Sequence, residues 1–215
     1  MTKFWQEEGH ETTVLSGMVH YQTGKKRDRY KGKFTYKDEY SDKVTVLRCH
    51  VSESYNSSFL GRLWGYFSFV FSSIYAGLFK TKGKFDIIVV TSPPLFVGIT
   101  ALVLSIFKRI PFVFEVRDLW PESAIDTGVL NNKTIINLAY WFEKFIYGKA
   151  KLVNVLTPAF RDKLVNKKNI PADKVIFIPN AADFSLSDSL LETFDREAFR
   201  IAQGWQNKTV IPYVR

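Results

Sequence analysis

The chain has 215 residues, of which 46% are hydrophobic and 16% aromatic, so it can bury a substantial core and wholesale disorder is excluded. Its formal net charge of +9 favours an anionic partner or surface. A single cysteine, Cys49, excludes an internal disulfide, and three histidines without ligand spacing give no zinc signature, so we expect no metal.

The first residues, MTKFWQEEGHE, are charged and lack the apolar core of a signal peptide. They predict the tail of a helix that stops at Gly9, followed by a strand over 11–17. A helix that opens a Rossmann-type domain normally follows a strand and a glycine-rich turn. We therefore expect the first strand of the domain to be missing.

The segment 25–37 is strongly basic, and Tyr30, Phe34 and Tyr36 are interleaved with its cations. Nucleic acid, an anionic membrane or phosphorylated lipid, and plain solvent are all compatible with such a segment. Asp28 is its one acid, against seven cations: Lys25, Lys26, Arg27, Arg29, Lys31, Lys33 and Lys37.

The longest apolar stretch, 63–79, lies between Arg62 and Lys80 and falls just short of a typical bilayer span. It contains three serines and two glycines. We predict an aromatic-rich helix that packs on a sheet or lies at a membrane interface, rather than one that crosses the bilayer.

Short apolar runs alternate with stretches of helical length, which predicts an α/β, doubly wound Rossmann-like domain. Continuous apolar runs further predict strands buried on both faces of one parallel sheet. The expected strands are 11–17, 43–49, 85–92, 111–117, 151–157 and 174–180, and the expected helices are 58–82, 95–109, 132–149 and 158–169.

Ligands of such sheets bind outside the carboxyl ends of the strands. Pro93 and Pro94 close one predicted strand, and the segment FEVRDLWPES (114–123) ends the next. This second segment changes from apolar to charged residues within one turn, so it is a candidate site.

Several segments together resemble the amino-terminal half of a family-4 retaining glycosyltransferase of GT-B fold, over roughly residues 4–214. The resemblance is greatest to bacterial envelope-polysaccharide transferases that add amino sugars to a lipid-linked acceptor. The segments that carry it, in order, are EEGHETTVLSG, FDIIVVTSPPLFVG, FEVRDLWPES, NVLTP and VIFIPNAAD.

The resemblance implies two Rossmann-like domains, the first holding the acceptor and the second most of the nucleotide-sugar donor. We expect residues 1–203 to be the acceptor domain, truncated at its start, and 204–215 to be the linker and first strand of an absent donor domain. On this interpretation the chain transfers no sugar unaided, and the carboxyl-terminal domain could be separately encoded. At the hinge, relatives have Asn-Gly-Val-Asp where this chain has Asn180-Ala181-Ala182-Asp183, and the lost glycine removes easy access to positive φ.

The resemblance also implies a front-face displacement that retains anomeric configuration and needs no metal or other cofactor. We expect Asp118 to orient or polarise the acceptor hydroxyl and Arg117 to pair with a phosphate. In the structural alternative Asp118 caps the following turn and Arg117 pairs with Glu122. Strand alternation also places Glu115 on the face of Arg117, which favours an ion pair between them.

Further contacts are expected around this pair. Trp120 is expected to be a wall of the site or part of the core, and turn geometry is the alternative role for Ser92 and the hinge residues. The expected substrate-binding residues are Ser92, Pro93, Trp120, Glu122, Asn180 and Asp183. The expected contacts to an acceptor phosphate or the membrane are Lys25, Lys26, Arg27 and Arg29.

The expected partner is a lipid-linked saccharide, met at the cytoplasmic, inner face of the cell membrane by a peripherally bound protein. Nucleic acid is not expected, because no recognition motif accompanies the basic charge. The alternative function is a non-catalytic accessory or degenerate module that binds lipid-linked glycan or a partner subunit.

Overall fold

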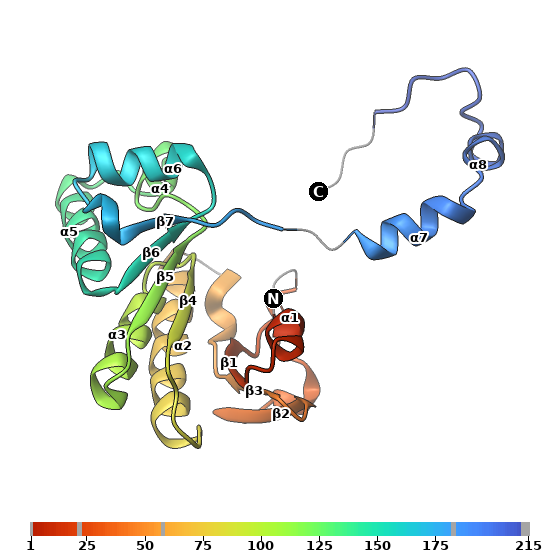
Figure 1. Ribbon diagram of the computed structural model, residues 1–215. Coiled ribbons are helices and arrows are strands. Elements are labelled where there is room, and N and C mark those ends of the chain that lie inside the picture. The colour runs from red at the N-terminus through yellow and green to blue at the C-terminus, as the bar shows by residue number, and fades with distance from the viewer. Residues whose placement is uncertain (1, 21–22, 57–58, 182–183, 212–215) are drawn as a thin grey trace. The chain divides into compact units, whose positions relative to one another are not determined.

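The computed structural model describes residues 2–20, 23–56, 59–181 and 184–211, in two compact units, Met1–Pro179 and Asn180–Arg215. The first unit alternates strands and helices around parallel strands, so the α/β, Rossmann-like prediction is confirmed (Figure 1).

A four-stranded parallel sheet forms the larger part of the first unit, in the order β4-β5-β6-β7. Each strand coincides with a predicted apolar run, and the connections are mainly helical. The strands are β4 (Ile88–Ser92), β5 (Phe112–Val116), β6 (Leu152–Val155) and β7 (Val175–Phe177). The helices between them are α3 (Val97–Lys108), α4 (Glu122–Asp126), α5 (Lys133–Lys149), α6 (Pro158–Asp162), the π-helix η3 (Lys163–Lys167) and the 3₁₀ helix η4 (Ala172–Lys174).

The core of this sheet lies between β5 and the helices α3 and α5. Phe114 is fully buried, and its ring centroid lies 5.4 Å from that of Tyr147 on α5. Gly98 on α3 allows the close approach of these elements, since a Cβ at that position would lie 2.7 Å from Ile146. Asn132 starts α5 by accepting hydrogen bonds from the backbone N–H groups of the first turn.

A separate three-stranded sheet precedes it, in the order β1-β3-β2, with β1 and β3 parallel and β2 antiparallel. The prediction of one sheet of six strands is therefore wrong: the first two predicted strands pair with each other as β1 and β3, and β3 also pairs with β2, which was not predicted. The bounds are β1 (Thr12–Gly17), β2 (Thr35–Ser41) and β3 (Val44–Cys49), with the 3₁₀ helices η1 (Asp28–Tyr30) and η2 (Glu53–Asn56) beside them.

Burial on both faces of the strands is confirmed only in part. Phe112, Phe114 and Val116 of β5 are buried, but Val89 of β4 is 40% exposed. β4 is an edge strand of its sheet, so its outward-facing positions lack a neighbour on one side.

The helix α2 (Phe59–Phe79) packs through its serines, which explains polar residues in so apolar a stretch. Ser72 donates to the carbonyl of His50 at the end of β3 (2.7 Å), and Ser73 shares a hydrogen bond with Thr100 of α3 (2.8 Å). The predicted packing on a sheet is thus confirmed. None of the described helices is long and apolar enough to cross a membrane.

The first helix, α1 (Thr2–Glu7), ends as predicted at Gly9, which has a φ of +91° and donates its N–H to the carbonyl of Gln6. The second unit holds α7 (Ser185–Thr193) and α8 (Arg196–Ala202), and the side chain of Asp195 caps α8. The compact units divide after Pro179, whereas the predicted domains divide after residue 203.

Candidate functional site at the carboxyl edge of the sheet

A buried polar pair underlies the carboxyl ends of β5 and β6. Glu115 is 6% exposed and Asn154 is 5% exposed, and the Asn154 amide donates to the Glu115 carboxylate at 3.4 Å. The other end of the same amide, Oδ1, accepts the backbone N–H of Ile178, just beyond β7, at 2.9 Å. One side chain therefore ties β5, β6 and the segment that leaves β7.

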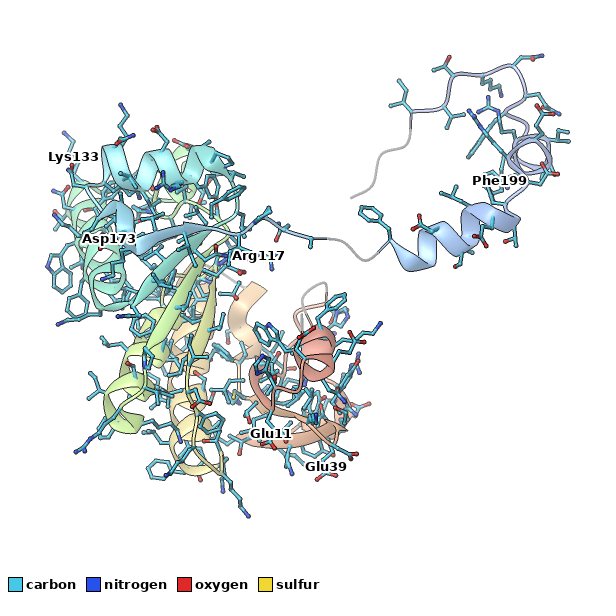
Figure 2. The ribbon with its side chains drawn as sticks, in the orientation of Figure 1. Glu11, Glu39, Arg117, Lys133, Asp173 and Phe199 are labelled. Carbon is cyan, nitrogen blue, oxygen red and sulfur yellow. The ribbon has the colours of Figure 1, made fainter. Side chains whose placement is uncertain are left out.

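Arg117 follows the last residue of β5 and extends from that end of the strand (Figure 2). Its Nε lies 4.0 Å from the carboxylate of Glu115, so the predicted ion pair between these residues is confirmed. The Arg117 side chain is 47% exposed, so its guanidinium lies partly at the surface, beside a buried carboxylate. This is a suitable arrangement for binding an anion such as a phosphate.

Asp118 is the next residue and is partly buried. The cap position of α4 is occupied by Pro121, with no side-chain hydrogen bond, so Asp118 does not cap that helix. The Asp118 charge acts on the buried Tyr147, whose pKa is raised above its ordinary value, first by burial and then by the neighbouring carboxylates. Asp118 thus sits where the core of the sheet meets its carboxyl edge.

The neighbouring strand end places Ser92 and Pro93 differently. Ser92 is 3% exposed, and its hydroxyl donates to the carbonyl of Glu115 at 3.1 Å, so it links β4 to β5. Pro93 is exposed at the strand exit. Of the two, only Pro93 presents its side chain at the surface, and substrate contact by either stays a prediction.

Trp120 packs into the structure next to the candidate site. Its ring lies 5.9 Å from that of Phe96 in an edge-to-face contact, and it packs against the core of the four-stranded sheet. These contacts support the wall or core role, and they fix the loop that carries Arg117 and Asp118.

Glu122 opens α4 and is paired with two lysines rather than placed toward the strand end. Its carboxylate lies 2.9 Å from the Nζ of Lys168 and 3.5 Å from that of Lys163. Lys168 also reaches Glu143 of α5 at 2.6 Å. Although burial opposes ionisation of Glu122, the hydrogen bond and charges of these lysines keep its pKa below the ordinary value.

A cavity of about 360 Å³ adjoins this charge cluster. Burial raises the pKa of Glu143 to about 7, against the opposing attraction of Lys168. The lining residues are Glu122, Tyr140, Glu143, Lys144, Tyr147, Lys167, Lys168 and Ile170.

The basic segment, residues 25–37, connects β1 to β2 and includes the first residues of β2. Two of its cations contact other side chains of the protein. Lys25 and Arg27 are exposed, whereas the Nζ of Lys26 lies 3.0 Å from the Nδ1 of His50. Arg29 pairs with Asp38 at 3.4 Å. Contact of these four cations with an acceptor phosphate or a membrane stays a prediction.

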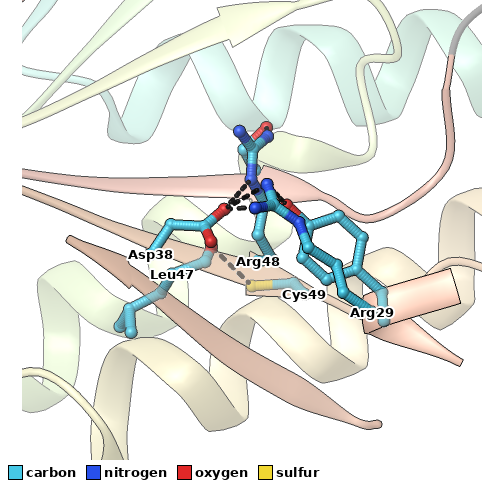
Figure 3. Close-up of polar contacts among 7 residues, drawn as sticks. Arg29, Asp38, Leu47, Arg48 and Cys49 are labelled. Carbon is cyan, nitrogen blue, oxygen red and sulfur yellow. Dashed lines mark hydrogen bonds and ion pairs between the residues drawn. The ribbon is translucent and has the colours of Figure 1, made fainter. Parts of the chain in front are cut away.

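Asp38 collects several donors across the three-stranded sheet. It accepts from the hydroxyl of Tyr30 (2.8 Å) and from the Nε of Arg48 (3.1 Å), besides Arg29 (Figure 3). Arg48 also donates to Ser16 of β1, so the network spans β1, β2 and β3. Its residues hold the sheet together, which limits the charge that this face offers to a ligand.

The hinge residues cannot be joined to the site. Asn180 is exposed and belongs to the second unit, and Asp183 lies outside the described residues. Within the described part of the chain, no three His, Cys, Asp or Glu side chains could together hold a metal ion.

Comparison with known proteins identifies the family. The glycosyl transferase 4-like domain matches residues 1–181, which is most of the chain. The chain belongs to this family. A protein of Escherichia coli (strain K12) named "Putative colanic acid biosynthesis glycosyl transferase WcaI" is 24% identical over 188 residues, which cover 86% of this chain and 46% of that protein. The chain thus spans about half the length of the curated relative that it matches.

Three residues at or beside the candidate site, Asn154, Glu143 and Lys168, were not found from the sequence. Asn154 stands in an otherwise apolar run, KLVNVLT, and a lone amide inside a buried strand was the available signal. Glu143 stands among aromatic residues in AYWFEKF, and a lone carboxylate within an aromatic stretch of a helix was the available signal for it. Lys168 gave none, because lysine is common at the end of a helix.

Proposed function

We propose that the chain is the acceptor-binding half of a glycosyltransferase that moves a sugar from a nucleotide-sugar to a lipid-linked acceptor in cell-envelope polysaccharide biosynthesis. The donor-binding half is a carboxyl-terminal domain of the same or of another polypeptide. Transfer retains the anomeric configuration, and the protein works peripherally at the cytoplasmic face of the membrane. Family membership and the likeness to a colanic acid glycosyl transferase support this proposal.

The observation that carries the proposal is the Glu115–Arg117 pair at the carboxyl end of β5. Arg117 binds an acceptor or donor phosphate, because its guanidinium lies partly at the surface, at the carboxyl end of β5 and beside a buried carboxylate. The arrangement is pre-organised, so little side-chain reordering is needed when the phosphate arrives.

Asp118, the adjacent residue, accepts a hydrogen bond from the acceptor hydroxyl and orients it toward the donor carbon. As the bond to the leaving phosphate breaks, positive charge develops on the sugar and a carboxylate nearby stabilises it. The chain of contacts from Asn154 through Glu115 to Arg117 keeps the phosphate ligand in register with this carboxylate.

Binding of the acceptor tests the proposal without any donor domain. The full chain is titrated with detergent micelles that carry a polyprenyl-diphosphate saccharide, and with micelles that carry polyprenyl diphosphate alone. We expect Arg117→Ala to weaken binding to both by about tenfold or more, since it removes a charge-assisted contact to phosphate. Asp118→Asn should reduce only the part of the affinity that depends on the sugar.

Asp126→Asn is the matched control, because Asp126 is exposed at the end of α4 and its substitution removes the same charge as Asp118→Asn. If Asp118→Asn and Asp126→Asn reduce the affinity for the saccharide micelles equally, Asp118 does not contact the acceptor sugar. If the chain does not distinguish the two kinds of micelle at all, it does not bind the acceptor sugar and the proposal fails.

A further inference from the structure

One face of α2 carries exposed apolar side chains near the start of the helix and again from Phe71 to its end, with the buried Ser68 between them. Its five large side chains are between 37% and 73% exposed, and at about 100° per residue they fall within an arc of roughly 100°. They extend over about 28 Å of helix at 1.5 Å per residue. We call them the α2 stripe: Leu60, Trp64, Phe71, Tyr75 and Phe79.

The opposite face of α2 is already occupied by protein. Ser73 is 1% exposed and hydrogen-bonded to Thr100 of α3, and a Cβ on Gly77 would lie 2.6 Å from Leu104 of the same helix. The exposed stripe is therefore the outer surface of a packed helix. A surface helix of a globular protein normally carries polar residues on that side, so an apolar outer face indicates a binding surface.

The charges around the stripe are of one sign. From residue 59 to residue 85 the sequence contains no acid and four cations: Arg62, Lys80, Lys82 and Lys84. All four are exposed, with Arg62 in the first turns of α2 and the lysines just beyond its last residue. The Nζ of Lys80 lies 5.6 Å from the ring centroid of Tyr75, beside the stripe.

A contact with the three-stranded sheet extends the stripe toward the basic segment. The ring of Phe34 packs edge-on against Tyr75, with centroids 5.5 Å apart, and Phe34 is itself half-exposed. Lys33, the preceding residue, lies 4.2 Å from the ring of Tyr36. Aromatic side chains and cations from two distant parts of the sequence thus meet on one surface.

We propose that the α2 stripe docks the protein on an anionic lipid bilayer, with α2 lying in the plane of the interface. This proposal deepens the proposed function, because it names the surface that holds the protein where a lipid-linked acceptor is found. Trp64, Phe71 and Phe79 enter the boundary between headgroups and acyl chains, where aromatic rings are favoured. Lys80, Lys82 and Lys84 pair with lipid phosphates.

The distribution of charge favours a bilayer over nucleic acid. Three cations, Lys80, Lys82 and Lys84, lie just beyond the last residue of the stripe, whereas a nucleic-acid surface places cations along the contact itself. The complementary charge of an anionic headgroup layer matches cations at the rim and apolar side chains at the centre.

Vesicle co-sedimentation of the full chain tests the proposal. Vesicles of phosphatidylcholine are compared with vesicles in which about a third of the lipid is phosphatidylglycerol, since each lysine near such a surface adds to the attraction. We expect about tenfold or greater preference for the anionic vesicles at low salt, decreasing as salt screens the surface.

Two double variants divide the apolar and the charged contributions. Trp64→Ser with Phe71→Ser should weaken binding by about tenfold or more on anionic vesicles, because exposed apolar area no longer enters the lipid. Lys80→Glu with Lys82→Glu should abolish the preference for anionic lipid. All four positions are exposed, so circular dichroism should show an unchanged fold.

Matched controls come from α5. Trp141→Ser removes an equally exposed tryptophan, and Lys133→Glu with Lys149→Glu makes the same change in net charge; both should bind vesicles like the unsubstituted chain. The proposal is overturned if the stripe variants bind as well as these controls. A dimer in solution that Phe71→Ser dissociates would assign the stripe to a second copy. Oligonucleotide binding that Lys80→Glu abolishes would assign it to nucleic acid.

The vesicles contain no saccharide, so this test is independent of the acceptor test. If the chain binds vesicles but not the saccharide micelles, the proposed docking surface stands and the proposed acceptor-binding function fails. If the chain binds the saccharide micelles but not the vesicles, the proposed acceptor-binding function stands and the docking proposal for the α2 stripe fails.

Discussion

The ammonium group of Lys168 lies 2.6 Å from both carboxylate oxygens of Glu143. The same ammonium lies 2.9 Å from Glu122, at the start of α4. One cation at the end of the π-helix η3 therefore holds α4 and α5, and α4 follows directly from the loop that carries Arg117 and Asp118. The position of that loop therefore depends on the charge cluster of Lys168, Glu122 and Glu143, none of which has a role in the proposed transfer reaction.

The stability of the protein should depend on the protonation of Glu143. Burial raises the pKa of Glu143 to about 7 in the folded state, from an ordinary value of 4.5, so the folded chain holds a proton there that the unfolded chain has lost. This stabilisation is complete below about pH 4.5 and is lost as the pH rises through 7. Glu143→Gln cannot lose that proton. The difference in free energy of unfolding, variant minus unsubstituted chain, should therefore increase by on the order of 2 kcal/mol from pH 5 to pH 8.

Urea denaturation of both proteins at several pH values measures this difference. The partly buried His50, whose pKa is lowered by burial and by Lys26, is common to both proteins and cancels in the comparison. A difference in stability that does not change with pH would show that Glu143 is ionised throughout the range. Lys168→Met should destabilise the protein at pH 8 by about 3 kcal/mol, because two carboxylates lose their shared buried partner.

Asp38 should contribute more to stability than its exposed neighbour. Burial opposes its ionisation, but the hydrogen bonds from Tyr30 and Arg48 outweigh this and hold its pKa below the ordinary value. Asp38→Ala leaves those donors without their acceptor, and we expect a loss of about 1–3 kcal/mol in the free energy of unfolding at pH 7. Glu39→Ala, on the same strand with a side chain 81% exposed, should change it by less than about 0.5 kcal/mol. Equal effects in urea denaturation would show that the Asp38 network does not stabilise the sheet.

Cys49 should be unreactive in the folded protein. It is fully buried at the end of β3, and burial raises the pKa of its thiol to about 12, so little thiolate exists at pH 8. We expect iodoacetamide to modify it at least about a thousandfold more slowly than an unfolded control, and urea to restore the ordinary rate. Lys133→Cys in a Cys49→Ser background supplies an exposed thiol for calibration. Rapid alkylation of native Cys49 would mean that the end of β3 opens readily.

The strands of the parallel sheet could be predicted because each is a short apolar run bounded by turn residues. PFVFEVR, for example, contains β5 almost residue for residue. The strand β2, TYKDEYS, could not be predicted in this way, because its centre is the charged run Lys37-Asp38-Glu39, and charged residues are common in edge strands. Its charges led to the interpretation of a basic loop.

The position of Arg117 and its pairing with Glu115 followed from the alternation of side chains along one strand. The pairing of Glu115 with Asn154 did not, because it depends on the register of two strands separated by 39 residues. The lysine partners of Glu122 could not be predicted, for the same reason. Lys168, 46 residues further along the chain, competes for it, and nothing local in the sequence indicates that contact.

Asn154 has a mechanical consequence for the junction between the two units. Its planar amide joins Glu115 on one side to the N–H of Ile178 on the other, two residues before the second unit begins. A planar group transmits displacement without the slack that rotatable methylenes would introduce. A displacement of the backbone at Ile178 therefore acts, through this amide, on the carboxylate that pairs with Arg117.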